Sequence, residues 1–139
     1  MKALKTIGII AAVFAAGILL LIGSFTYVTG YKITDIDSSA SPNGDYTVFY
    51  QNVGEPDWPF GYSHARIVLK HKDETVSQYK FDVANDGGVL QSGSWSVLWK
   101  DDCAEVTISG EEQRDVLYIF YFDGRTDSVQ LDTKCGEWK

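Results

Sequence analysis

The hydrophobic residues of the chain fall into two patterns. From Ile7 to Val28 the sequence runs for 22 residues without a charged side chain, and most of its residues are apolar. After residue 31, apolar residues alternate with polar ones over short segments that are separated by turn residues. The first pattern is typical of a membrane-spanning helix and the second of half-buried β-strands.

The apolar segment is long enough to cross a bilayer. As a helix, residues 7–28 would extend about 33 Å. A cleaved secretory signal is the alternative, but its apolar region is usually only about 7–15 residues long and is followed by a small-x-small cleavage site. At the exit of this segment only Val28 and Gly30 provide such a site. The pattern therefore favours a retained signal anchor in contact with membrane lipid.

The charges at the N-terminus predict the orientation of this helix. Lys2 and Lys5 are the only charged side chains near that end. Under the positive-inside rule, residues 1–6 are cytoplasmic and the remainder of the chain after the membrane helix, residues 29–139, is extracytoplasmic.

The domain after the helix is predicted to be all-β. Tyr79, Phe81 and Val83 alternate with polar residues, and so do the apolar residues of 95–99 and 103–109. No stretch has apolar residues at helical spacing for a dozen positions. We expect an antiparallel β-sandwich or partly open barrel. Its strands, about eight in number, lie near 32–36, 45–52, 64–71, 76–83, 93–99, 103–109, 114–122 and 128–133.

One predicted strand differs from the others. Residues 116–122 are apolar on both faces, which is typical of a central strand that is covered on two sides. This pattern predicts a second layer of structure.

Composition and charge limit the partners that the protein could have. The chain has 139 residues with 12 Lys and Arg against 19 Asp and Glu, a formal charge of −7. Removing the two lysines of residues 1–30 leaves 10 basic and 19 acidic side chains, a charge of −9 for the domain. This excess of acid argues against a nucleic-acid partner, and the length allows one domain after the helix.

The two cysteines are candidates for a disulfide. Cys103 and Cys135 both follow the apolar segment, and an even number of cysteines in an oxidising compartment favours pairing. The bridge would stabilise the fold by about 3–4 kcal/mol. A simple meander would place them at opposite ends of parallel neighbours, about 17 Å apart, whereas a disulfide needs Cα atoms within about 7 Å. Pairing therefore requires a tail that folds back or a strand that crosses, and two unpaired cysteines are the alternative.

Several segments resemble a known group of proteins. The sequences SPNGDY, EPDWPFG, FDVANDGG and SGEEQ lie within residues 41–124. Their pattern resembles that of uncharacterised small membrane-anchored or lipoprotein-like extracytoplasmic proteins of Gram-positive bacteria. The resemblance implies no activity.

The best candidate surface is the segment from Glu55 to Tyr62, which contains three aromatic residues and two prolines. Such a loop could stack on a sugar ring through Trp58, Phe60 or Tyr62, while Glu55 and Asp57 accept hydrogen bonds from hydroxyl groups. It could also contact a protein. The default interpretation is that Trp58 and Phe60 close one end of the sandwich.

Other chemistry has weaker support in the sequence. Acidic residues gather at several predicted turns, but their spacing does not match a calcium-binding loop. His64 and His71 are expected on opposite faces of a strand, and neither has a motif partner. We expect no metal site and no cofactor.

The sequence as a whole favours binding over catalysis. We expect an extracytoplasmic binding module for a protein or a cell-wall glycan. An immunity-type inhibitor of a basic toxin or enzyme is one alternative, because the acidic domain would attract a basic partner. A small hydrolase with two catalytic carboxylates is the other.

Overall fold

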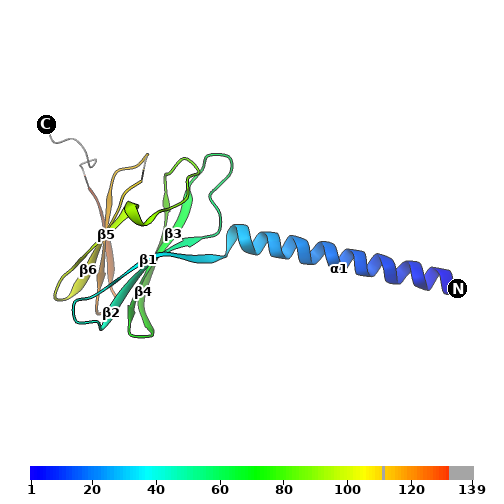
Figure 1. The fold of residues 1–139 in the computed structure, drawn as a ribbon, viewed down its shortest axis with the longest axis horizontal. Coiled ribbons are helices and arrows are strands. Elements are labelled where there is room, and N and C mark those ends of the chain that lie inside the picture. Colours follow the sequence, from blue (N-terminus) through cyan, green and yellow to red (C-terminus); the bar gives the residue numbers. More distant parts are fainter. Residues whose placement is uncertain (111, 132–139) are drawn as a thin grey trace.

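The computed structural model describes residues 1–110 and 112–131. A long N-terminal helix leads into a β-domain from which it projects (Figure 1). The elements in chain order are α1 (Lys2–Gly30), β1 (Ile33–Ala40), β2 (Tyr46–Val53), β3 (Ser63–His71), β4 (Glu74–Val83), the short 3-10 helix η1 (Ser92–Ser94), β5 (Trp95–Trp99), β6 (Cys103–Ile108), β7 (Val116–Tyr121) and β8 (Thr126–Gln130).

Helix α1 contains the predicted apolar segment 7–28. Its Ala, Ile and Leu residues favour a helical backbone, and it contains no proline. None of its residues is buried against the described part of the protein. The helix is long and apolar enough to cross a membrane.

The β-domain is a sandwich of two antiparallel four-stranded sheets. Strands β1 to β4 form one sheet in the order β1-β2-β3-β4, and β5 to β8 form the other in the order β5-β6-β7-β8. Each predicted strand overlaps an observed one. The predicted all-β fold after one helix is confirmed, and of the two predicted architectures the structure has the sandwich.

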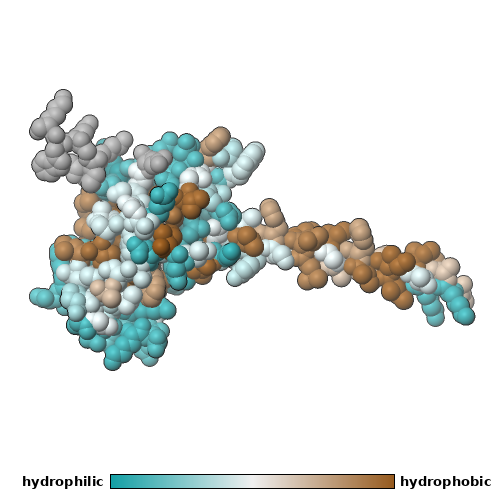
Figure 2. Space-filling view, viewed as in Figure 1, coloured by the Kyte–Doolittle hydropathy of each residue, from teal (hydrophilic) through white to brown (hydrophobic). Residues whose placement is uncertain are grey.

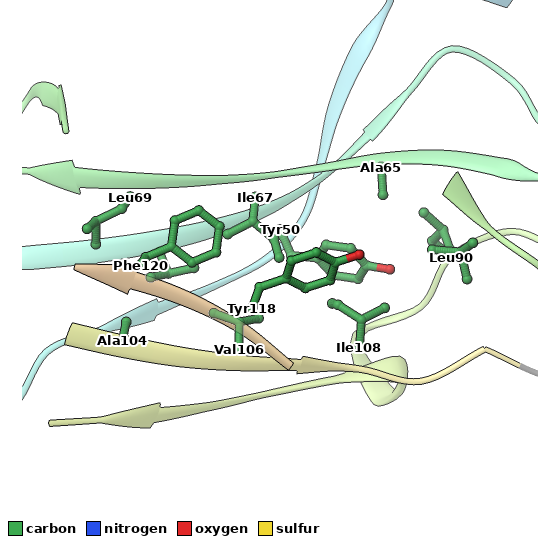
Figure 3. Close-up of a cluster of buried hydrophobic side chains, with 12 residues drawn as sticks. Tyr50, Ala65, Ile67, Leu69, Leu90, Ala104, Val106, Ile108, Tyr118 and Phe120 are labelled. Carbon is green, nitrogen blue, oxygen red and sulfur yellow. The ribbon is translucent and has the colours of Figure 1, made fainter. Parts of the chain in front are cut away.

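The core lies between the two sheets. Alternate residues of the central strands β2, β3, β6 and β7 point inward, so Tyr50 and Ile67 of the first sheet face Val106 and Phe120 of the second (Figure 3). All four of these side chains are 0% exposed. The alternation seen in the sequence is therefore the alternation of buried and exposed faces.

Polar contacts join the two sheets along the edge where β1 meets β5. Trp95 donates its indole N–H to the Asp37 carboxylate at 3.0 Å, and Trp99 donates to the Ser39 hydroxyl at 3.0 Å. The hydrogen bond from Trp95 lowers the pKa of Asp37. Both tryptophans thus pack an apolar ring on the core and satisfy their polar atom at its margin.

The prediction that residues 116–122 are covered on both faces is wrong in part. Strand β7 is central in its sheet, and its inward residues Tyr118 and Phe120 are buried. The outward residues Leu117 and Ile119 are only half-buried, because no further layer covers this face in the described residues.

The proposed disulfide stays a prediction. Cys103 begins β6 and is buried, which raises the pKa of its thiol. Cys135 lies outside the described residues, and those residues contain no disulfide. Strands β6, β7 and β8 do form a meander in which Cys103 pairs with Tyr121 at one end and Gln130 with Val116 at the other.

Candidate functional site

Residues 54–62, which we call the aromatic loop, connect β2 to β3 beside the C-terminal end of α1 (Figure 1). The expectation that this loop plugs the core is wrong. The side chains of Trp58 and Phe60 are 92% and 73% exposed. The segment after β4 contributes to the core instead, because Leu90 is 5% exposed within it.

The start of the aromatic loop lies directly on the end of α1. The Glu55 N–H donates to the Thr29 carbonyl at 2.8 Å, and the Gly54 N–H donates to the Lys32 carbonyl at 2.7 Å. Gly54 has φ +70, and a Cβ added to it would lie 2.2 Å from the Thr29 oxygen. Only glycine allows this close approach of the two backbones.

Hydrogen bonds within the loop fix its shape. The Asp57 N–H donates to the Tyr62 carbonyl at 2.9 Å, and the Gly61 N–H donates to the Asp57 carbonyl at 2.8 Å. The Gly87 N–H donates to the Gly61 carbonyl at 3.0 Å, which ties the loop to the segment after β4. The Trp58–Pro59 peptide bond is cis. The three backbone hydrogen bonds hold the loop in one shape, on which Trp58 and Phe60 are exposed.

His64 joins the loop to the first sheet. Its Nδ1 lies 2.7 Å from a carboxylate oxygen of Asp82 on β4, and its Nε2 lies 3.1 Å from one of Asp57 in the loop. The bond to Asp82, followed by the one to Asp57, raises the pKa of His64 against the opposing effect of burial. Because a carboxylate only accepts hydrogen bonds, both contacts are satisfied together only by the protonated imidazole.

The loop and the helix end enclose an open cleft of about 590 Å³, which we call the junction cleft. Phe25 and Thr29 of α1 form one wall, and Glu55, Asp57 and Trp58 form the other. The cleft therefore combines aromatic and apolar surface with two carboxylates. This combination suits a small polyhydroxylated ligand, because a sugar has apolar C–H faces and hydroxyl donors.

The structure brings together some of the predicted site residues. Glu55, Asp57 and Trp58 share the junction cleft, whereas Phe60 and Tyr62 are exposed but do not line it. Phe60 and Tyr62 belong to the same loop as the other three residues, but they lie outside the wall of the cleft.

The sequence interpretation missed the contributions of α1 and of His64. A two-residue turn at Lys72 and Asp73 pairs His71 with Glu74 and by itself would place His64 opposite Phe81. A β-bulge between Leu69 and Lys70 shifts the register by one residue, so that His64 pairs with Asp82. No pattern in the sequence marks this bulge, so the pairing of His64 with Asp82 could not be predicted. The position of Phe25 in the wall of the cleft had no signal in the sequence either, because it depends on how the helix meets the sheet.

The geometry does not support a serine nucleophile beside His64 or, within the described residues, a metal site. Ser63, beside His64, is fully buried and donates its hydroxyl to the Gly88 carbonyl at 2.7 Å, so it is not presented as a nucleophile. Within residues 1–110 and 112–131, no group of three or more His, Cys, Asp or Glu side chains is arranged to hold a metal ion.

Comparison with known proteins adds no assignment. No family model, no curated protein and no solved structure matches the chain. The resemblance to small extracytoplasmic proteins of Gram-positive bacteria therefore stays a prediction.

Proposed function

We propose that the protein is a single-pass membrane protein whose extracytoplasmic β-domain recognises a glycan in the junction cleft. The observation that carries this proposal is the 92% exposure of Trp58 on an ordered loop, beside Glu55 and Asp57. Trp58 shares the cleft with Phe25, which is 72% exposed, and adjoining exposed aromatic side chains of this kind mark a surface that another molecule covers.

The exposed surface of α1 supports a membrane anchor. Hydrophobic residues cover the helix along most of its length, whereas the β-domain has a mixed surface (Figure 2). Apart from its C-terminal end, where the aromatic loop lies on Thr29, no described part of the protein covers the helix. Lipid would remove this surface from water, and transfer of apolar surface out of water is favourable by about 25 cal/mol per Å².

The junction with the β-domain supports retention of the helix over cleavage. The site allowed by Val28 and Gly30 would remove Thr29, whose carbonyl accepts the hydrogen bond from Glu55. Cleavage would also remove the Thr29 backbone, against which Gly54 packs closely in its positive-φ conformation. The contacts are thus those of a continuous protein, and Lys2 and Lys5 favour a cytoplasmic N-terminus.

The chemistry of the cleft favours a neutral sugar over an anionic ligand. Glu55 and Asp57 accept hydrogen bonds from hydroxyl donors but repel an anion, and the formal charge of residues 31–139 adds to that repulsion. Trp58 offers a broad apolar face for the sugar ring. The size of the cleft fits one or two rings rather than a protein surface.

Titration of the full-length protein in detergent micelles with neutral hexose and N-acetylhexosamine disaccharides tests this proposal. We expect at least one sugar to quench tryptophan fluorescence in a saturable manner. Measured by isothermal titration calorimetry, which does not depend on the fluorescence of Trp58, Trp58→Ala and Glu55→Gln should each weaken this binding about tenfold. Leu98→Ala, at a 59% exposed position on β5, should not.

The same titrations also distinguish the alternatives. Binding to a sugar should change little with salt. The absence of a response to any sugar, together with salt-sensitive capture of a basic protein, would contradict glycan recognition and support the inhibitor alternative.

A further inference from the structure

The junction cleft has one wall formed by the membrane helix and one formed by the β-domain. From this we infer that its ligand is the sugar headgroup of a lipid in the same bilayer, rather than a free or wall-bound glycan. The inference rests on the proposed function, and it adds that the glycan is attached to a lipid of the same membrane.

The depth of Phe25 is the first argument. A helix that begins its span near Lys5 covers the hydrocarbon core of about 30 Å in about 20 residues, which places Phe25 at the outer boundary between acyl chains and headgroups. Phe25 lines the junction cleft together with Trp58. A ligand in this cleft therefore lies at headgroup depth.

The surrounding aromatic residues are the second argument. Aromatic side chains of the kind found at membrane interfaces are exposed on both the helix end and the loop. They include Tyr27 (59%), Tyr31 (68%), Phe60 (73%) and Tyr62 (54%). These positions place both sides of the cleft in the interfacial layer, where lipid headgroups are concentrated and wall polymers are not.

Charge selects among the lipids. The Glu55 carboxylate disfavours an anionic phospholipid headgroup, and so does the net negative charge that Asp57 and Asp82 leave around the protonated His64. A neutral glycosyl headgroup provides hydroxyl donors for the carboxylates of the cleft and an apolar ring face for Trp58. Its acyl chains would lie along the apolar surface of α1, which is unburied at Phe25 and toward the N-terminus.

Confinement to one bilayer also explains how an open cleft can hold its ligand. A shallow site with one aromatic face binds a free sugar weakly. When protein and ligand share a membrane, the effective concentration of the ligand is high, and the apparent affinity can rise by about a hundredfold or more without further contacts.

The test uses the full-length protein in phosphatidylcholine nanodiscs, with and without digalactosyldiacylglycerol. The Trp58 signal is the fluorescence of the wild type minus that of Trp58→Phe. We expect this signal to change with the glycolipid and to remain unchanged with phosphatidylglycerol or with diacylglycerol, which lacks the sugar. Soluble digalactosylglycerol is added to nanodiscs without glycolipid. Its half-saturating concentration should be about a hundredfold higher than that of the glycolipid.

Variants separate recognition of the sugar from insertion of the loop into lipid. Exchange of the glycolipid between nanodiscs can be followed with a fluorescent label on its acyl chain. Binding to the protein should keep the glycolipid in its original nanodisc. Trp58→Ala and Glu55→Gln should reduce retention about tenfold. Leu98→Ala should not, because Leu98 is exposed on β5 and does not line the cleft.

Each outcome bears on a different claim. Equal potency of the soluble headgroup and the glycolipid would overturn the inference and leave glycan recognition intact. An equal response to phosphatidylglycerol would overturn the selection of a neutral sugar. If Trp58 is already buried in pure phosphatidylcholine and neither sugar form changes its signal, the loop is a lipid anchor, and both the inference and the proposed function are wrong.

Discussion

Replacing Gly54 by alanine should damage the junction between α1 and the aromatic loop. The added Cβ would lie 2.2 Å from the Thr29 carbonyl oxygen, in a backbone with φ +70. The positive φ alone costs about 1–2 kcal/mol for alanine. Relieving the overlap with a backbone atom adds about 1–3 kcal/mol, so the free energy of unfolding should fall by about 2–5 kcal/mol.

Gly44 provides a matched control. It has φ +77 in the turn before β2, but a Cβ there would have no atom within 4 Å. Gly44→Ala should therefore cost only the conformational part, about 1–2 kcal/mol. The difference between the two variants measures the close approach of helix and loop.

Two assays are needed. Denaturant unfolding of the full-length protein in nanodiscs, followed by tryptophan fluorescence, gives the stability of each variant. Hydrogen exchange at the Gly54 and Glu55 amides reports the junction itself, and protection there should fall in Gly54→Ala but not in Gly44→Ala. Equal stability losses with unchanged protection in both variants would refute the reasoning.

Two further predictions concern the loop attachment and the core. The raised pKa of His64 means that its contacts stabilise the fold fully below the unfolded value of 6.5, and that this contribution is lost as the pH rises through the folded pKa. Because the groups are partly exposed, its size should be about 1 kcal/mol or less. Asp82→Asn should lower the His64 pKa in an NMR titration and reduce this pH dependence of unfolding; an unchanged pKa would contradict the geometry. In the core, Phe120→Ala should lower the free energy of unfolding by about 3–5 kcal/mol. Leu98→Ala, at an exposed position, should change it by about 0.5 kcal/mol or less in the same denaturant titration, and similar losses in both would contradict the assigned core.

Much of the fold was predictable because the sequence alternates with the period of a strand. Ala104, Val106 and Ile108 were expected on one face, and all three are 0% exposed. Residues 116–122 misled the prediction, since a strand in the middle of a sheet keeps its outward apolar residues partly covered by neighbouring side chains without another layer. The periodicity of a sequence shows which residues of a strand are exposed, but it does not show how many layers of structure the domain has.

The site was less predictable because it depends on contacts between distant segments. Composition identified the aromatic loop, and a rule that buries large apolar residues then placed Trp58 in the core. The structure places it at the surface, because the close packing of Gly54 against Thr29 directs the loop toward the helix. Such a contact joins residues far apart in the sequence and leaves no local pattern.

The central claim is that α1 crosses the membrane and holds the β-domain outside the cell. Labelling of Gly93→Cys in intact cells with a membrane-impermeant maleimide tests it most directly, since Gly93 is exposed and a side chain there meets no neighbour within 4 Å. We expect labelling above that of the wild type without permeabilisation, on a full-length protein that stays with the membrane after an alkaline wash. Labelling only after permeabilisation, or recovery of the full-length chain in the soluble fraction, would contradict the account.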